Sequence, residues 1–142
     1  VAVRFSRCCS PVPGDEIVGF VTRGRGVSIH RTDCINVINL PEDERGRLID
    51  AEWQVAENPT STEQYSTEIQ IFANNRIGLF ADISKVFTEK QIDITSMNVR
   101  TSKQGRATII MTFDIHGTEE LNRITDKIRQ IDGVLDIQRT TG

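Results

Sequence analysis

The chain has 142 residues, of which 37% are apolar and 26% charged, and its formal net charge is −3. These values suit one ordinary globular domain or two small ones, and we expect two. The sequence has neither an apolar run long enough to cross a bilayer nor a secretory leader, so we expect a cytoplasmic protein that does not contact membranes. The acidic balance argues against a protein that is covered by nucleic acid over its whole surface. Because the chain starts at Val1, within an apparent strand, we expect a fragment of a longer protein.

Charge is unevenly distributed along the chain. Residues 1–40 hold five arginines and three acidic residues, a local balance of +2 that leaves −5 for the remainder. Arginine is suited to bidentate contacts with phosphate, although arginines on a solvated surface are the simpler interpretation.

The first elements form a small unit rich in strands. VAVRF alternates apolar and polar residues, PVPGDE is a turn, and residues 17–22 and 27–30 form a hairpin across the glycine turn TRGRG. Thr32 or Asp33 then caps a short helix that stops by Pro41, and LIDAEW forms a last strand after the charged loop EDERGR. We therefore predict a β-rich α+β unit with one short helix over residues 1–56.

Three cysteines and a histidine in this unit are candidate metal ligands: Cys8, Cys9, His30 and Cys34. These residue types suit tetrahedral zinc, and a His and a Cys four residues apart is a spacing found in zinc modules. Adjacent ligands such as Cys8 and Cys9 need a bent backbone, since neighbouring side chains point in different directions. Two alternatives stand beside the metal site, namely small buried thiols in a reduced core and a cysteine nucleophile activated by His30.

The glycine turn presents arginines to a partner. Arg23 and Arg25 flank Gly24, but no phosphate-binding loop motif is present and no helix begins there. Together with two further arginines, they form a candidate set for binding RNA phosphate: Arg7, Arg23, Arg25 and Arg31.

The segment 57–64 has no apolar residue and is the predicted linker to a second unit over residues 65–142. In that unit strand alternation starts near Thr67, a helix follows the turn NNRIG, and a second strand slips phase near Ser96, which predicts a bulge. The strand with the clearest alternation runs over 107–115, and a helix from Thr118 precedes the closing strand VLDIQ. The order βαββαβ predicts a ferredoxin-like fold, with both helices on one face of an antiparallel sheet.

The turn between the first strand and helix of this unit is a candidate site for an amino-acid carboxylate, because backbone N–H groups at a helix start bind anions. The alternative is that Gly78 only permits a tight turn. Met97 and Asn98, on the following strand of a partner sheet, would complete the site. The whole candidate set is Asn75, Arg76, Ile77, Gly78, Leu79, Met97 and Asn98.

The motif RCCSPVPGDEIVGFVTRGRGVSIHRTDC, followed by IDAEW, closely resembles the C-terminal region of long RelA/SpoT (Rel) enzymes, which synthesise and hydrolyse the alarmone (p)ppGpp. In that family the unit is called a zinc-finger or ribosome-intersubunit domain, and an ACT domain follows it. NNRIGLFADIS resembles the ACT signature, although Phe80 stands where leucine is common.

The resemblance implies a regulatory, non-catalytic fragment of a stringent-response protein whose parent is a GTP pyrophosphokinase, a (p)ppGpp 3'-pyrophosphohydrolase or both. It implies possible zinc binding, contact with ribosomal RNA and tRNA in the full-length protein, binding of a branched-chain amino acid, and a homodimer through the ACT domain. The rival functions are a branched-chain amino-acid sensor and dimerisation module without an RNA role, and an independent cysteine enzyme.

Overall fold

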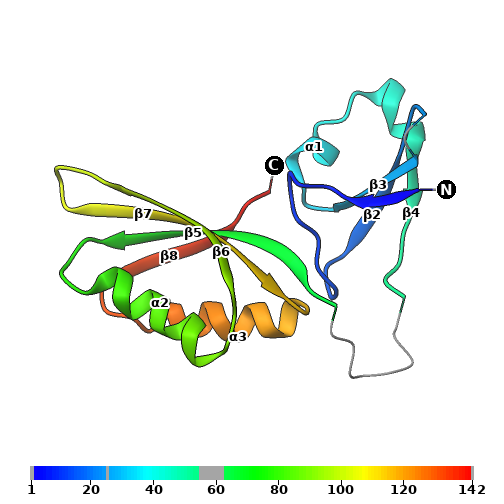
Figure 1. The fold of residues 1–142 in the computed structure, drawn as a ribbon. Coiled ribbons are helices and arrows are strands. Elements are labelled where there is room, and N and C mark those ends of the chain that lie inside the picture. Colours follow the sequence, from blue (N-terminus) through cyan, green and yellow to red (C-terminus); the bar gives the residue numbers. More distant parts are fainter. Residues whose placement is uncertain (1, 25, 55–62, 142) are drawn as a thin grey trace.

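A computed structural model describes residues 2–24, 26–54 and 63–141 as two units joined end to end (Figure 1). The first unit contains four short strands, a one-turn α-helix and a 3-10 helix: β1 (Val3–Phe5), β2 (Ile17–Thr22), β3 (Gly26–Arg31), α1 (Ile35–Ile38), η1 (Glu42–Arg47) and β4 (Leu48–Asp50). The second contains the predicted βαββαβ order: β5 (Tyr65–Asn74), α2 (Leu79–Glu89), β6 (Ile94–Thr101), β7 (Arg106–Ile115), α3 (Thr118–Arg129) and β8 (Val134–Arg139).

The sheet of the first unit has the order β1-β3-β2-β4, in which only β1 and β3 run parallel. The predicted hairpin of β2 and β3 is confirmed, with Ile17 opposite Arg31 and Thr22 opposite Gly26. The charged loop after Pro41 is a 3-10 helix, and the last strand is shorter than LIDAEW. The helix cap was predicted wrongly, because Cys34 is the N-cap of α1 and makes no side-chain capping bond.

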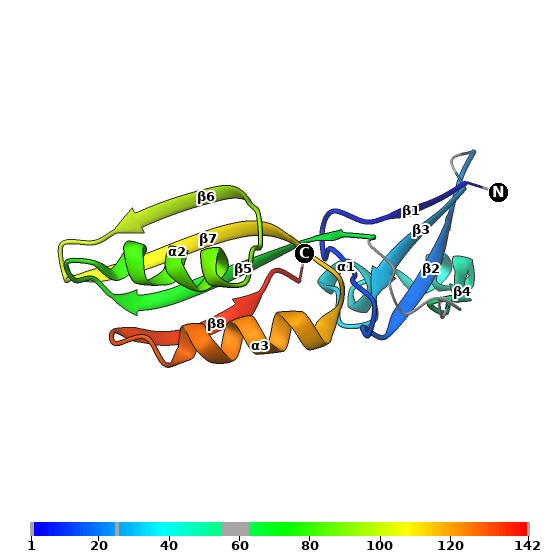
Figure 2. The same cartoon turned by 60° about the horizontal axis from the view of Figure 1, so that its bottom comes forward.

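The second unit packs both long helices on one face of an antiparallel sheet ordered β6-β7-β5-β8 (Figure 2). Alternation places Ile69, Ile71 and Ala73 of β5 under the helices, and β7 alternates in the same way. The predicted bulge is confirmed, since the pairing of β6 with β7 shifts between Ile94 and Ser96. The α+β class predicted for both units is therefore correct.

The two units differ strongly in their apolar cores. The core of the second unit is a large cluster that includes Phe87 and Phe113, whose ring centroids lie 4.8 Å apart. The described core of the first unit consists of Cys9, Cys34 and Val37, with Cys8, Val18 and Leu48 packed against them. So small an apolar core needs another source of stability, as domains of this size commonly do.

The first unit lies at the end of the second sheet where β5 begins and β7 and β8 end (Figures 1 and 2). Trp53 stacks on Phe5, and both meet Tyr65 of β5 edge to face. Thr141 follows β8 back to α1, where its carbonyl accepts a hydrogen bond from Ile35 N at 2.7 Å. No helix among the described residues has the length and apolarity required to cross a membrane.

Candidate metal centre

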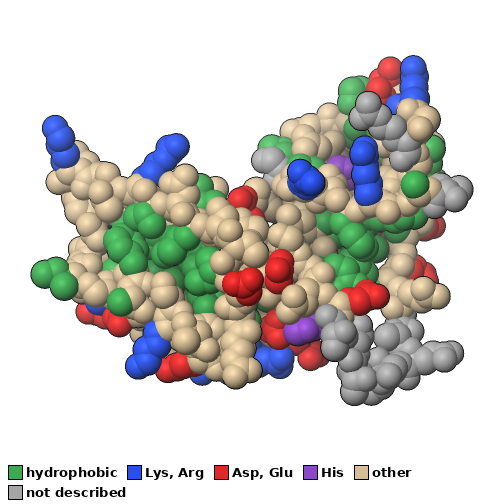
Figure 3. Space-filling view, viewed as in Figure 1, with side chains coloured by type: hydrophobic (Ala, Val, Ile, Leu, Met, Phe, Trp, Pro, Cys, Tyr) green, Lys and Arg blue, Asp and Glu red, His purple; other side chains and the backbone are tan. Residues whose placement is uncertain are grey.

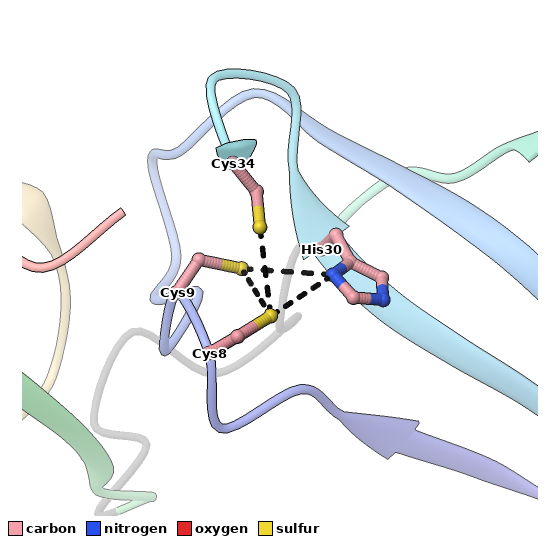
Figure 4. A group of neighbouring side chains, drawn as sticks. All are labelled: Cys8, Cys9, His30 and Cys34. Carbon is pink, nitrogen blue, oxygen red and sulfur yellow. Dashed lines mark hydrogen bonds between the residues drawn. The ribbon is translucent and has the colours of Figure 1, made fainter. Parts of the chain in front are cut away.

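The four predicted ligands meet in the first unit (Figure 4). Cys8 and Cys9 lie in a turn after β1, His30 lies near the end of β3, and Cys34 starts α1. Their ligand atoms all lie within 4.8 Å of one another. Three short segments, of which the first lies 21 positions before the other two, therefore converge on one point.

A tight turn explains how neighbouring cysteines face the same centre. The backbone bends so that Ser10 N donates to Ser6 O at 3.1 Å, and Ser10 has a φ of 47°, in the left-handed region that non-glycine residues seldom adopt. Cys8 Sγ and Cys9 Sγ lie 4.0 Å apart as a result. The bend is already complete at Ser10, before the prolines and glycine that follow.

The spacing of the donor atoms fits a tetrahedral metal. Zinc–ligand bonds of about 2.3 Å to sulfur and about 2.0 Å to nitrogen give about 3.8 Å between two sulfurs and about 3.5 Å between sulfur and nitrogen. Cys8 Sγ lies 3.5 Å from Cys34 Sγ and 3.4 Å from His30 Nδ1, and Cys9 Sγ lies 3.9 Å from the same nitrogen. The cluster could therefore hold a metal ion such as zinc.

Hydrogen bonds around the cluster orient its members. Ser28 Oγ lies 3.2 Å from His30 Nε2, so this nitrogen can donate to the hydroxyl while Nδ1 faces the thiols. Arg31 N donates to Cys9 Sγ at 3.3 Å, and Ser6 Oγ lies 3.0 Å from Cys8 Sγ. Such outer contacts are typical of metal sites, where they fix the tautomer and direction of the ligands.

The protonation behaviour of the cluster follows from its burial. Burial raises the pKa of Cys9 to about 12 and also raises the pKa of Cys34, because a lone thiolate is poorly solvated there. Burial opposes ionisation of Cys8 as well, but hydrogen bonds, the largest from Ser6, outweigh it and lower its pKa. Burial lowers the pKa of His30, which keeps the imidazole neutral. A bound cation would supply the positive charge that the buried thiolates otherwise lack.

The same geometry bears on the two alternatives. A nucleophile and its base form a pair, whereas His30 Nδ1 lies within 4 Å of two thiols and a third sulfur adjoins Cys8. A reduced apolar core would not require the imidazole to point its nitrogen at sulfur atoms. The arrangement resembles a set of ligands more closely than either alternative.

The predicted RNA-binding arginines lie in different environments. Arg7 and Arg23 are exposed, and Arg25 lies outside the described residues. Figure 3 shows basic side chains on both sides of a histidine on one face of the first unit. Arg7 also lines a cavity of about 500 Å³ at the junction of the two units, together with Phe5, Tyr65 and Glu68.

Arg31 is used inside the protein, contrary to its predicted RNA-facing role. It is 6% exposed and forms an ion pair with Asp33 at 2.5 Å. Its Nη1 donates to Cys9 O at 3.3 Å and to Thr140 O at 3.2 Å. A guanidinium held by these three acceptors is not available to RNA phosphate in this conformation.

The predicted amino-acid site divides into two places. Gly78, with a φ of 83°, caps α2, while Ile77 is fully exposed and Leu79 is buried. The Arg76 guanidinium fixes this turn by binding Asp82 Oδ2 at 2.7 Å and Asp132 O at 2.8 Å.

The two remaining residues of that set lie on another strand. Met97 and Asn98 lie in the middle of β6, opposite Met111 and Ile110 of β7. The turn itself contacts the far end of the β6–β7 hairpin, where Asn75 N donates to Gly105 O at 2.8 Å. Within one chain, the turn and the middle of β6 are therefore separate places on the ACT-like sheet, and Met97 and Asn98 would have to come from a partner sheet.

Several residues around the centre were not predicted. Ser28 could have been found, because residues two apart on a strand share a face and Ser28 precedes His30 by two. Asp15 and Arg139, which form an ion pair between the units at 2.7 Å, are 124 positions apart and give no local signal.

Comparison with known proteins gives the chain its family. The family model of the RelA/SpoT RIS domain matches residues 1–54, and that of the ACT domain matches residues 61–139. The chain is 39% identical over 141 residues to a GTP pyrophosphokinase of Streptomyces coelicolor, covering 99% of this chain and 16% of that protein. It is 38% identical over 139 residues to the GTP pyrophosphokinase of Escherichia coli, covering 97% of this chain and 18% of that protein.

The chain is also similar to a further curated protein and to a solved structure. A bifunctional (p)ppGpp synthase/hydrolase RelA of Mycobacterium tuberculosis is 37% identical over 141 residues, covering 99% of this chain and 18% of that protein. The crystal structure of the ACT domain from the GTP pyrophosphokinase of Chlorobium tepidum covers 54% of this chain and 99% of that one, with 22% identity and a TM-score of 0.49. The chain thus spans about a sixth of the length of its curated relatives, and it belongs to the RelA/SpoT family as a regulatory RIS domain followed by an ACT domain.

Proposed function

We propose that this segment controls a stringent-response enzyme that makes or degrades (p)ppGpp, by contacting ribosomal RNA through its RIS domain and relaying that contact through its ACT domain. The observation that carries the RNA role is the segregation of charge. Residues 1–40 of the RIS part hold five arginines against three acidic residues, and Arg7 and Arg23 among them are exposed, while the acidic excess belongs to residues 41–142. In the full-length protein, tRNA on a stalled ribosome would be the further partner.

Ribosome co-sedimentation of the full-length protein over a range of salt concentrations tests the RNA role. Replacing Arg7 and Arg23 by alanine should weaken binding and reduce the slope of log affinity against log salt by about 1 to 2, because each phosphate contact contributes about 0.7 to 0.9. The matched control replaces Arg100 and Arg123, which are exposed on the ACT domain. Equal affinity and slope in both double variants would refute the RNA role of the RIS arginines.

We also propose that the Cys8, Cys9, His30 and Cys34 centre binds zinc in a structural role. Four protein ligands leave no open position for a substrate, which is the pattern of structural rather than catalytic zinc. Bound zinc would stabilise a domain whose apolar core is small, by joining three segments of its chain. Metal analysis of protein purified under reducing conditions should find one zinc per chain. The single substitution Cys34→Ser should abolish zinc binding. A metal-free but folded wild-type chain would contradict the proposal.

Self-association through the ACT domain is favoured by the edge strand β6. Its residues from Thr95 to Thr101 are all exposed, and Met97 and Val99 are each 37% exposed on a strand that forms one edge of the sheet among the described residues. Such an edge is a template for pairing with a second strand. Light scattering should find a dimer, and Val99→Asp should shift it toward monomer, whereas Leu135→Asp, at an exposed residue of β8, should not.

The alternative function is a branched-chain amino-acid sensor that acts without RNA. Calorimetry with valine or isoleucine tests it on this chain. Saturable heat that disappears when Asn75 is replaced by alanine would favour the sensor, whereas no heat at millimolar ligand would exclude affinities of practical use.

A further inference from the structure

The contact between the RIS and ACT domains is built from buried polar groups. Arg139 at the end of β8 binds both oxygens of Asp15, at 2.7 and 3.0 Å, and also donates to Ser10 O at 3.2 Å. The Arg139 and Asp15 side chains are only 17% and 9% exposed. Bidentate pairing of this kind fixes orientation as well as distance.

A loop of the RIS domain also enters the ACT domain. Val12 is completely buried and belongs to the core cluster of the ACT domain. Pro13 O accepts a hydrogen bond from Thr118 N, at the start of α3, at 2.8 Å. Gly14 lies so close to Thr118 that a Cβ at this position would be 2.0 Å from the hydroxyl. The loop is shaped by Asp15, whose Oδ2 accepts from Val12 N at 2.8 Å.

Three of the residues that contact the ACT domain directly follow a member of the metal centre. Ser10, which binds Arg139, follows Cys9, and Ile35, which binds Thr141 O, follows Cys34. Arg31 follows His30, and its guanidinium joins Cys9 O to Thr140 O. The polar contacts that position the ACT domain therefore depend on the same three backbone segments that the four ligands bring together.

We propose that metal binding at this centre sets the docking of the ACT domain on the RIS domain, so that the docked pair is stable in the metal-bound chain and separates in the metal-free chain. The proposal rests on the proposed zinc binding. Without a metal, the four ligand side chains meet one another only through contacts of 3.4 to 4.0 Å that involve thiols, which are weak hydrogen-bonding groups, and the segments keep backbone bonds such as Ser6 N to Ile29 O and Cys34 N to Arg31 O. Movement of any one of them would displace Ser10, Arg31 or Ile35 from its partner in the ACT domain.

The coupling must act in both directions, because linkage between two equilibria is reciprocal. A variant that weakens docking without touching a ligand should therefore weaken zinc binding. Asp15→Asn retains the size of the side chain but removes the charge that pairs with Arg139. Competition against a chelator should show zinc affinity lowered by about 5- to 150-fold, the usual range of such coupling. The matched control is Asp82→Asn, which removes a partner of Arg76 on the surface of the ACT domain and should leave zinc affinity unchanged.

Nuclear magnetic relaxation of backbone amides in the 142-residue chain measures docking directly. In the zinc-bound chain both domains should tumble with one correlation time, and after chelation the ACT domain should tumble faster and independently. The spectrum of the ACT core should persist, which separates undocking from unfolding. The fluorescence of Trp53, the single tryptophan, gives a second readout because its ring contacts Tyr65 across the junction.

The outcomes separate the two proposals. If metal analysis finds no zinc, the proposed zinc binding fails and this inference fails with it. If zinc binds but chelation leaves a common correlation time, and Asp15→Asn leaves zinc affinity unchanged, zinc binding stands and only the coupling is refuted. Independent tumbling after chelation, reversed by adding zinc alone, supports the coupling.

Discussion

Val12 belongs to the RIS domain by sequence, but the structure makes it a core residue of the ACT domain, so Val12→Ala should destabilise the ACT domain. The side chain is completely buried in the cluster that contains Ile69, Met111 and Phe113. Removing two methyl groups costs about 1.6 kcal/mol at about 0.8 kcal/mol per group. A residual cavity of about 50 Å³ would add about 1.2 kcal/mol at about 24 cal/mol per Å³. The free energy of unfolding should therefore fall by about 1.5 to 3 kcal/mol, depending on how far the neighbours relax.

Urea unfolding followed by circular dichroism at 222 nm is the appropriate assay. The two long helices, α2 and α3, both belong to the ACT domain, whereas α1 has four residues, so the helical signal reports mainly on the ACT domain. Val3→Ala makes the same chemical change at a side chain that is 60% exposed and should alter stability by less than about 0.5 kcal/mol. Both variants are unfolded in the presence of a saturating concentration of zinc. A transition moved no further by Val12→Ala than by Val3→Ala would refute the placement of Val12 in the ACT core.

Two further substitutions test local features. Gly14→Ala should destabilise the chain by more than about 2 kcal/mol in thermal unfolding, because φ is 101° and the added Cβ would clash with Thr118. The control is Gly24→Ala, where φ is 74° and the added Cβ meets open space, so the loss of stability should be only about 1 kcal/mol. Similar losses in both would show that the conformation, rather than the clash, dominates. Ser28→Ala should weaken zinc binding about 10- to 100-fold in chelator competition, because the His30 ring loses its outer hydrogen bond, and unchanged affinity would show that the imidazole is oriented by other contacts.

Local pattern was sufficient to predict most of the secondary structure. Alternation over 107–115 and helical spacing after Gly78 each describe a single element whose burial is decided by its own periodicity. The hairpin of β2 and β3 follows in the same way from a glycine turn between two apolar runs. The helix cap failed because Thr32 and Asp33 are good capping residues in general, while the actual chain path places Cys34 at the cap with its thiol in the cluster.

The four ligands of the candidate centre could also be predicted from the sequence, but the residues that surround them could not. Residue type and spacing indicated the four ligands, and the resemblance to RelA/SpoT proteins agreed with them. The burial of Arg31 could not be predicted, since an arginine in a strand of a basic segment is ordinarily exposed. Its burial depends on Thr140, which is 109 positions away.

The order of elements, the α+β class of both units, the family and the four clustered side chains could all be predicted before the fold was known, because each rests on local periodicity, turn chemistry or motif. The folded chain was needed to see that Cys8 and Cys9 face one centre, that Val12 enters the core of the other domain, and that Arg31 and Arg139 join the two domains. These features depend on contacts between residues far apart in the chain, whose pairing is set by packing and by the need to satisfy buried charge. The arginines that the segment shows to a partner can be proposed from composition, but which of them are free to bind is a property of the fold.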